Sequence, residues 1–290
     1  MGVQILADSG CDLPGNVVEE YNIDLLPIIV VDDKDEYLDG VTITPKQIYD
    51  DMRKGKVYKT AQIGPKVFQE KFEQLAKEGK SAIYIALSSK LSGTYQTAAL
   101  IVESLKDRYP DMDISVIDSK SASLGFGLLV HKAGVMAKEG KSKEEILDML
   151  DFYVKHIEHI VTVDDIEYLF RGGRVSRTQA FVGGLLNIKP ILEMPRDGTL
   201  VPFEKTRGRS KVLKRMIEII GERGGKADLK NQTIGICHGD DIEGATKLKE
   251  MIMEEYGCTD FIIGMIGAAI GAHSGPGTLT VYFLNEKFTG

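Results

Sequence analysis

The sequence contains no tryptophan and only three cysteines, Cys11, Cys237 and Cys258, among 290 residues. Three scattered cysteines are too few for a disulfide framework or a four-cysteine zinc site, which favours a reducing compartment. The most apolar stretch, residues 261–272, is about a dozen residues long, whereas a membrane-spanning helix requires roughly 20. The first residues also lack the basic segment and long apolar core of a signal peptide. We therefore expect a cytoplasmic protein.

Positive charge is not in excess, because 36 Lys and Arg residues stand against 43 Asp and Glu residues and the formal net charge is −7. This balance argues against a protein that binds nucleic acid or uses a polybasic surface to bind membranes. With 43% hydrophobic and 27% charged residues, the composition is that of a soluble globular protein.

Common enzyme signatures are absent as well. Five residues separate Gly134 from Gly140-Lys141, where a P-loop has four, and the segment follows a predicted helix instead of a strand. The sequence has no G-x-S-x-G elbow, no H-E-x-x-H helix and no G-x-G-x-x-G after its first strand. Four of the five histidines show no metal-ligand spacing and are interpreted as packing or surface residues; they are His131, His156, His159 and His238. These absences favour binding over catalysis and predict no cofactor.

Apolar runs rich in Val and Ile alternate with helical patterns in the first half of the chain. The predicted strands cover residues 3–7, 26–31, 82–87 and 114–117, and the predicted helices cover residues 14–21, 65–77, 93–106 and 122–138. This alternation predicts an α/β domain with a mostly parallel sheet and flanking helices.

A second domain is predicted to follow. Residues 139–141 resemble a hinge, and Ser142 with Glu145 forms a capping box that opens a helix ending near His156. Further strands are predicted at residues 160–163, 189–194, 200–205, 233–237, 260–266 and 278–284. Arg196-Asp197-Gly198 is a hairpin signal, so this second sheet should be mixed or antiparallel. We place the domains at residues 1–140 and 141–290, with a ligand between them.

The clearest ligand signal is the hydroxyl-rich segment of residues 88–94, which runs from a buried strand into a helix. The N–H groups at a helix N-terminus favour an anion, Ser92 and Thr94 can donate hydroxyl hydrogen bonds, and Gly93 permits close approach. Simple helix capping by these hydroxyls is the alternative. Further hydroxyls occur in other loops, at Thr60, Ser119 and Ser121.

Residues 8–14 contain two carboxylates, Asp8 and Asp12, directly after the first predicted strand, at an edge of the sheet where α/β proteins bind ligands. The alternative is a structural role in which Asp12 caps the next helix and Pro14 lies in its first turn. Both interpretations can hold together.

Two basic segments and one histidine are further candidates. Arg171-Gly172-Gly173-Arg174 and residues 205–211 can hold guanidinium groups near a phosphate or a carboxylate, although a solvated basic surface is the alternative for each. His273, beside a glycine-rich turn, can donate to an anion or relay a proton, or it can be a structural turn histidine.

Taken in order, these segments resemble the DegV family. The matching motifs are D-S-x-x-D-L-P from Asp8, Thr60 with Gln62, S-S-x-L-S-G-T from Ser88, R-G-G-R from Arg171, I-K-P-I-L from Ile188, K-x-R-G from Lys205 and H-x-G-P-G from His273. The resemblance spans nearly the whole chain. Two positions depart from the family pattern: Ala61 stands where a second hydroxyl is usual, and Thr280 stands where a glycine is usual.

The resemblance implies a two-domain α/β protein that encloses one long-chain fatty acid between its domains. In some members the bound acid is presented to a separate ATP-dependent fatty acid kinase subunit, and the resulting acyl phosphate enters phospholipid synthesis. The implied partners are therefore a long-chain fatty acid, a kinase subunit and, transiently, a membrane, with no nucleic acid and no cofactor. The protein is expected to be a carrier and not an enzyme.

The resemblance also implies roles for individual residues. Thr60 and Ser92 are the expected carboxylate contacts, Gly93 offers a backbone N–H group, and His273 lies close by. Arg171, Arg174 and Arg207 match basic positions that dock the kinase or contact the acyl phosphate.

An alternative hypothesis is an enzyme that acts on a small phosphorylated or carboxylated metabolite. It would use Asp8, Asp12 and His273 as acid or base, because ionisable groups cluster at predicted sheet edges. It predicts a small, wet pocket, whereas a lipid carrier requires a dry, apolar one.

Overall fold

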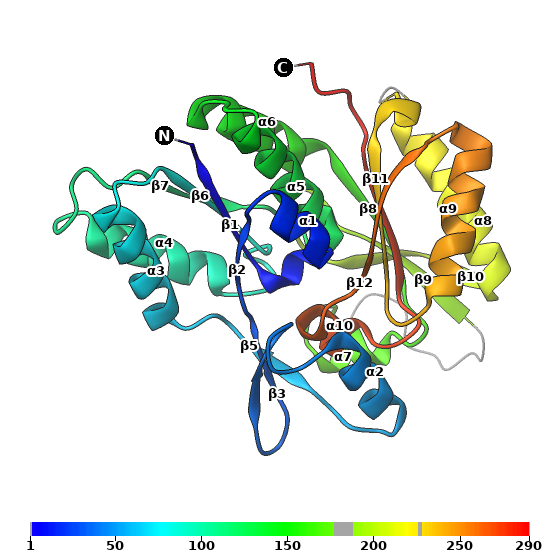
Figure 1. Ribbon diagram of the computed structural model, residues 1–290. Helices are drawn as coiled ribbons and strands as arrows, with labels where there is room; N and C mark the ends of the chain where they lie inside the picture. The colour runs from blue at the N-terminus through cyan, green and yellow to red at the C-terminus, as the bar shows by residue number, and fades with distance from the viewer. Residues whose placement is uncertain (1, 177–187, 226–227, 290) are drawn as a thin grey trace.

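The structure is a computed structural model that describes residues 2–176, 188–225 and 228–289. Its first sheet contains four parallel strands in the order β2-β1-β6-β7 (Figure 1). These strands are β1 (Gln4–Asp8), β2 (Asp24–Leu26), β6 (Ala82–Ala86) and β7 (Ile114–Asp118). Every residue of β6 is buried, as expected for a central strand whose two faces are both covered.

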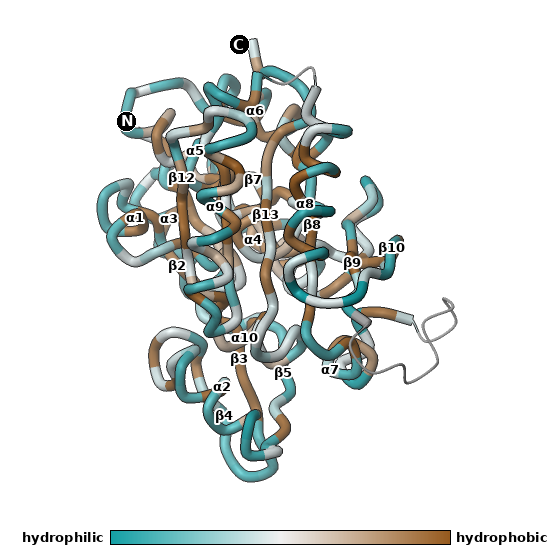
Figure 2. The backbone as a smooth tube through the Cα atoms, turned by 90° about the vertical axis from the view of Figure 1, so that its right-hand side faces the viewer, coloured by the Kyte–Doolittle hydropathy of each residue, from teal (hydrophilic) through white to brown (hydrophobic). Residues whose placement is uncertain are grey.

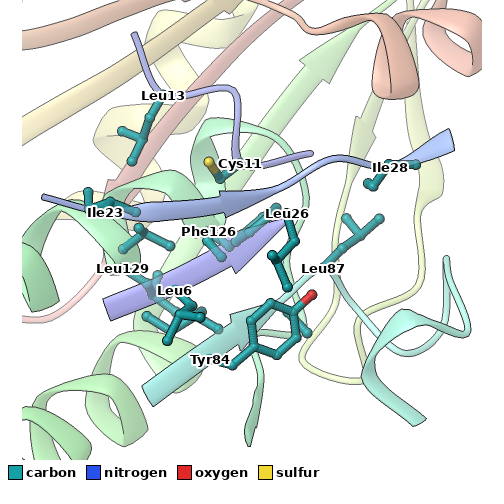
Figure 3. Packing of buried hydrophobic residues seen from close by; sticks show 14 of the residues in the cluster. Leu6, Cys11, Leu13, Ile23, Leu26, Ile28, Tyr84, Leu87, Phe126 and Leu129 are labelled. Atoms are coloured by element: carbon teal, nitrogen blue, oxygen red, sulfur yellow. The ribbon is translucent and has the colours of Figure 1, made fainter. Parts of the chain in front are cut away.

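Helices pack on this sheet and complete the first hydrophobic core. They are α1 (Gly15–Glu20), α3 (Pro65–Lys77), α4 (Thr94–Leu105), α5 (Leu124–Lys138) and α6 (Lys143–His156). Figure 3 shows Leu6 and Tyr84 of the sheet packed near Phe126 and Leu129 of α5. The Ser142 and Glu145 capping box at the start of α6 is present as predicted.

The second sheet contains six strands in the order β10-β9-β8-β13-β11-β12. Its strands are β8 (Ile157–Thr162), β9 (Ile188–Glu193), β10 (Val201–Arg207), β11 (Thr233–His238), β12 (Asp260–Met265) and β13 (Leu279–Leu284). Only the pair β11–β12 is parallel, and β9 and β10 form the predicted antiparallel pair. The predicted fold class, a parallel sheet followed by a mixed sheet, is therefore confirmed.

The two sheets share one helix between them. α5 contacts β1 and β6 of the parallel sheet and β8, β11 and β13 of the mixed sheet. It is buried around most of its circumference, which is how a helix that is apolar on all sides is accommodated. The outer face of the mixed sheet is covered by α8 (Arg209–Gly224) and α9 (Ile242–Tyr256), as Figure 1 shows. A second core lies under these helices.

A smaller unit lies at one end of the molecule (Figure 2). It contains an antiparallel sheet in the order β4-β3-β5 and three helices that contact one another or this sheet. Its elements are β3 (Ile29–Val31), β4 (Glu36–Leu38), β5 (Lys59–Ala61), α2 (Pro45–Arg53), α7 (Glu167–Arg171) and α10 (Ala268–Ser274). Two short 3-10 helices, η1 (Ser9–Cys11) and η2 (Leu229–Asn231), complete the described elements.

The small sheet corrects one sequence prediction. Residues 26–31 are not a single strand, because the chain leaves the parallel sheet after Leu26 and joins the antiparallel sheet at Ile29. Pro27 lies between the two strands, and a proline has no N–H group to extend the ladder of a central strand. The strands β4 and β5 and the helices α2, α9 and α10 were not predicted, although the Thr44 cap and Pro45 mark the start of α2.

Asp12 does not cap α1, whose N-cap is Pro14, so the predicted capping role is wrong. Asp12 ends η1 with a left-handed backbone (φ 52°). Its side chain accepts a hydrogen bond at the start of α10 instead. The predicted domain boundary after Gly140 stays a prediction; α5 and α6, on either side of it, pack against each other.

Candidate functional site

A cavity of about 200 Å³ lies between the two sheets and the small unit. Most of its wall is apolar, formed by residues from β8, α7, α10 and the connecting loops. The principal apolar side chains are Ile28, Leu87, Leu91, Val161, Val163, Leu169, Met194, Leu200, Ile266 and Ile270. The cavity between the two sheets is therefore largely apolar.

One wall of the cavity is the face of the mixed sheet. Alternate residues of β8 and its extension reach the cavity, namely His159, Val161 and Val163. β13 pairs with β8 so that Tyr282 is opposite His159 and Thr280 is opposite Val161. Successive side chains of a strand point to opposite faces, so this row follows from the register. From Val163 to His159 the wall extends about 13 Å, at roughly 3.3 Å per residue.

Polar groups gather at the end of the cavity next to α10 and the start of α4. Thr60 Oγ1 of β5 lies 2.7 Å from His273 Nε2 of α10. Ser92 Oγ lies 2.8 Å from Thr94 Oγ1 and accepts a hydrogen bond from the Thr94 N–H group at 3.3 Å. We call this the α4 end of the cavity.

The backbone at Gly93 is approached closely by another side chain. A Cβ atom at Gly93 would lie 1.9 Å from Gln62 Oε1, so this position tolerates no side chain while Gln62 is in place. The Gln62 amide donates to Thr97 Oγ1 at 3.0 Å. Gly93 caps α4 without a side-chain hydrogen bond, which leaves the helix N-terminus suited to an anion.

Arg174 supplies positive charge at the same end. Its Nε donates to the Leu91 carbonyl oxygen at 3.2 Å and its Nη1 to the Gly172 carbonyl oxygen at 2.7 Å. Among the described residues of the cavity wall it is the only charged side chain. Burial lowers the pKa of Arg174, but an arginine keeps its proton in proteins.

His273 is neutral in this environment. Burial, together with the nearby Arg174 guanidinium, lowers the pKa of His273 to about 3. Its Nδ1 atom is buried and has no hydrogen-bond partner. The ring also packs against Gly172, where a Cβ atom would lie 2.2 Å from Nδ1. A neutral imidazole beside Thr60 can accept or donate a hydrogen bond without adding charge.

The start of α10, the helix that carries His273, is held by two buried carboxylates. Asp12 Oδ1 accepts from the Gly267 N–H group at 2.9 Å, and Asp39 Oδ1 accepts from the Ala268 N–H group at 2.8 Å. Burial raises the pKa of Asp12 well above its usual value and also raises that of Asp39. The structural role of Asp12 is therefore to position α10.

Asp8 is also a structural carboxylate. It is fully buried and accepts hydrogen bonds from the Leu87 N–H group at 2.8 Å, the Tyr84 hydroxyl at 3.2 Å and the Gly10 N–H group at 3.2 Å. Burial raises its pKa to about 7. Neither Asp8 nor Asp12 belongs to the described wall of the cavity, so neither is placed to exchange a proton with a ligand there.

The opposite end of the cavity, next to α5, contains a second polar group. His159 Nε2 lies 2.6 Å from Ser121 Oγ, and the His159 ring meets the Tyr282 ring edge-on with 5.4 Å between centroids. Both aromatic residues are 2% exposed. Burial lowers the pKa of His159 to about 3. We call this the α5 end.

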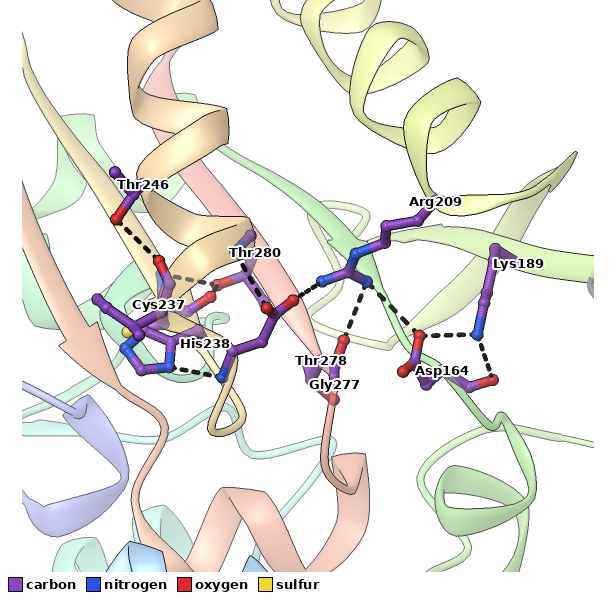
Figure 4. A network of polar contacts seen from close by, with 12 residues as sticks. Asp164, Lys189, Arg209, Cys237, His238, Thr246, Gly277, Thr278 and Thr280 are labelled. Carbon is purple, nitrogen blue, oxygen red and sulfur yellow. Dashed lines mark hydrogen bonds and ion pairs between the residues drawn. The ribbon is translucent and has the colours of Figure 1, made fainter.

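A polar network fixes the loop that leads into β13 (Figure 4). Arg209 donates to the Gly277 carbonyl oxygen at 3.0 Å and pairs with Asp241 and Asp164. Within β13, Thr280 Oγ1 bonds both the Cys237 N–H group and the Cys237 carbonyl oxygen, each at 3.2 Å. The threonine that departs from the family pattern thus joins β13 to β11.

Comparisons with known proteins agree with this architecture. A family model described as "Uncharacterised protein, DegV family" matches residues 2–286. The chain belongs to the DegV family. It is similar to a DegV domain-containing protein from Clostridium perfringens, with 42% identity over 284 residues that cover 97% of both chains.

Solved DegV structures share the fold. A DegV family protein from Thermus thermophilus, described by its fatty acid binding, superposes with a TM-score of 0.87 at 28% identity and covers 97% of this chain and 99% of its own. DegV from Bacillus subtilis, a fatty acid binding protein, gives a TM-score of 0.83 at 31% identity and covers 97% of this chain and 98% of its own.

The structure brings together most of the residues singled out by the DegV resemblance. Thr60, Ser92, Gly93, His273 and Arg174 all lie on the cavity wall. Their individual roles stay predictions.

The other two arginines lie apart from this group. Arg171 is exposed with its guanidinium over the Tyr168 ring at 4.9 Å, and Arg207 is exposed at the end of β10.

The sequence interpretation treats His159 as a packing or surface residue and so does not identify it as part of the cavity wall. The predicted strand began at residue 160, whereas β8 begins at Ile157. With the correct start, the two-residue period places His159 on the same face as Val161 and Val163. Ser121 was noted only as a loop hydroxyl, and its contact with His159 depends on tertiary structure.

Two features are absent from the described part of the chain, residues 2–176, 188–225 and 228–289. No helix there combines the length and the apolar character that crossing a membrane requires. Nor do three or more His, Cys, Asp or Glu side chains in the described ranges come together in a way that could hold a metal ion.

Proposed function

We propose that this DegV protein binds one long-chain fatty acid, with its hydrocarbon tail in the cavity and its carboxylate at the α4 end. The observation that carries the proposal is the largely apolar cavity whose only charged wall residue, within the described chain, is Arg174. The fatty acid binding of the DegV proteins from Thermus thermophilus and Bacillus subtilis supports it.

The energetics favour a tail-dominated complex. Burying about 14 methylene groups at roughly 0.8 kcal/mol each contributes on the order of 11 kcal/mol. Association costs about 4 to 15 kcal/mol. Each hydrogen bond to the carboxylate contributes about 1.5 to 3 kcal/mol, which is less than the tail contributes but enough to fix its direction.

The carboxylate is assigned to the α4 end for electrostatic reasons. Thr60 and Ser92 offer hydroxyl groups, Gly93 lies at the helix N-terminus, and Arg174 contributes a positive charge nearby. An anion is stabilised by such donors where water is scarce. His273 lies against Thr60 and can complete the hydrogen bonding of the carboxylate.

We infer further that the protein presents the bound acid to a separate ATP-dependent fatty acid kinase subunit and is itself not an enzyme. This part rests on the family resemblance. Arg171 and Arg207 are exposed and so accessible to a partner. A cytoplasmic location and transient membrane contact for loading remain part of the proposal.

Native mass spectrometry of the purified protein, followed by solvent extraction, tests the binding function. We expect one co-purified acyl chain of roughly 14 to 18 carbons, because each buried methylene group adds roughly 0.8 kcal/mol toward offsetting the cost of association. Thr60→Ala and Ser92→Ala should each weaken binding by about 1 to 3 kcal/mol. Thr199→Ala, in the exposed β9–β10 turn, is the control. A protein that neither carries nor binds such an acid would contradict the proposal.

The kinase step has its own test. Arg171→Ala and Arg207→Ala should retain the acid but no longer retain an ATP-dependent kinase in a pulldown, whereas Arg108→Ala should retain both. Arg108 is an exposed arginine that pairs with Glu73, and exposed pairs contribute little to stability. Equal kinase recovery with all three variants would count against the docking role.

The alternative enzyme function finds no support at the cavity. It requires Asp8 and Asp12 to serve as acid or base, but both are buried away from the wall and are hydrogen-bonded to the protein. It also requires a small, wet pocket, whereas this one is largely apolar. Turnover of a small metabolite without a partner protein would support the enzyme function.

A further inference from the structure

The α5 end of the cavity is closed by a transverse row of three side chains. Tyr282 of β13 pairs with His159 of β8. On the other side, β8 and β9 pair with Val161 opposite Leu192, and Met194, directly after β9, lines the same cavity as His159. All three residues belong to the cavity wall.

Two members of this row are fixed in place. His159 is bonded to Ser121 and packed edge-on against Tyr282. Its ring also abuts α5, because a Cβ atom at Gly125 would lie 2.5 Å from His159 Nε2. Met194 is only half-buried, and methionine adapts its shape readily. It is therefore the adjustable member of the row.

Beyond the row lies a second pocket, of about 260 Å³. His159 and Met194 line both this pocket and the cavity. The second pocket is charged, since Arg223 pairs with Glu158 at 3.0 Å and with Glu193 at 2.5 Å. The partition between an apolar cavity and a polar pocket is thus one layer of side chains thick.

We propose that His159 and Met194 form the end wall that sets the longest acyl chain this protein binds. The inference rests on the proposed fatty acid binding and adds the residues that determine chain-length specificity. Each methylene buried before the wall strengthens binding about fourfold. A longer chain must displace Met194 and place its methyl end among charged side chains, where that gain is lost.

Substitution of Met194 tests the end wall. Met194→Ala should open the partition and shift the co-purified acids to longer chains, with affinity for a chain two methylenes longer rising about 15-fold relative to wild type. Met194→Phe should shift the distribution to shorter chains. Met251→Ala, at a half-buried methionine in the second core, should leave the distribution unchanged. The measurements are mass spectrometry of extracted acids and competition binding with saturated acids of graded length.

The two proposals fail in different ways. If wild-type protein carries no acyl chain and binds none, the proposed function is wrong. If it binds one, and both Met194 variants fold but retain the wild-type length distribution, the end wall is wrong while the binding function stands. Thermal unfolding of each variant verifies that it is folded.

Discussion

The two ends of the cavity use the same local arrangement with different electrostatics. Each contains a buried, neutral histidine whose Nε2 lies near a hydroxyl group, at 2.7 Å for His273 and 2.6 Å for His159. Each ring packs against a glycine, Gly172 for His273 and Gly125 for His159. Both ends also lie at a helix N-terminus, that of α4 or that of α5. Among the described wall residues, the guanidinium group of Arg174 is present at the α4 end alone.

This difference indicates that polarity alone does not define a carboxylate site. Imidazole and hydroxyl groups can hydrogen-bond to one another and need no ligand, as His159 and Ser121 do. A buried carboxylate requires charge or several directed donors in addition. The α4 end provides them, and the α5 end is suited to a methyl group.

The largest expected effect is the loss of affinity for a dicarboxylic acid, which carries a carboxylate at both ends. Hexadecanedioate has to bury its second carboxylate at the α5 end, where the described wall has no charged partner. The unpaired charge costs several kcal/mol, so affinity should fall about 1,000-fold relative to hexadecanoate. Competition against a fluorescent fatty acid measures both ligands. Equal affinities would mean that the α5 end accepts an anion.

Removal of the charge at the α4 end should have the next largest effect. Arg174→Gln keeps hydrogen-bonding capacity but loses the cation, so fatty acid affinity should fall by about 1.5 to 3 kcal/mol, or roughly 10- to 100-fold. Isothermal titration measures the loss. Arg108→Gln, which removes an exposed arginine paired with Glu73, is the matched control. If Arg174→Gln lost less affinity than the control, the carboxylate would have to bind away from Arg174.

The smallest expected effect is on the pH dependence of stability, which tests whether the two histidines are neutral in the folded protein. The pKa of His159 is about 3 in the folded protein and near 6.5 when unfolded. Below pH 6.5 the unfolded chain therefore binds a proton that the folded chain does not, and stability falls as the pH falls.

His159→Gln should remove about 1 kcal/mol of this loss per pH unit between pH 6.5 and 5. The pKa of His273 is also lowered to about 3, so His273→Gln should act in the same direction. Its effect should be of similar size, because the folded pKa of each histidine is about 3. Urea unfolding at a series of pH values checks both variants. Parallel curves for wild type and His159→Gln would show that the histidine is protonated in the folded state.

Structural features that depend on residues close together in the sequence could be predicted. The Ser142 capping box opens α6, and the signal at Arg196-Asp197-Gly198 correctly predicts antiparallel β9 and β10. Residues 88–94 do lead from β6 into α4 at the cavity. The split at Pro27 and the early start of β8 were missed, because strand ends depend on which partner strand is available.

Residue patterns along the chain predicted the alternation of strands and helices around the parallel sheet, the hydroxyl-rich turn before α4 and the family resemblance. The positions of Thr60, Ser92, Arg174 and His273 at one end of the cavity, and of His159 at the other, depend on the tertiary structure. Strand register and helix packing join residues that are distant in sequence, and burial in that packing keeps both histidines neutral.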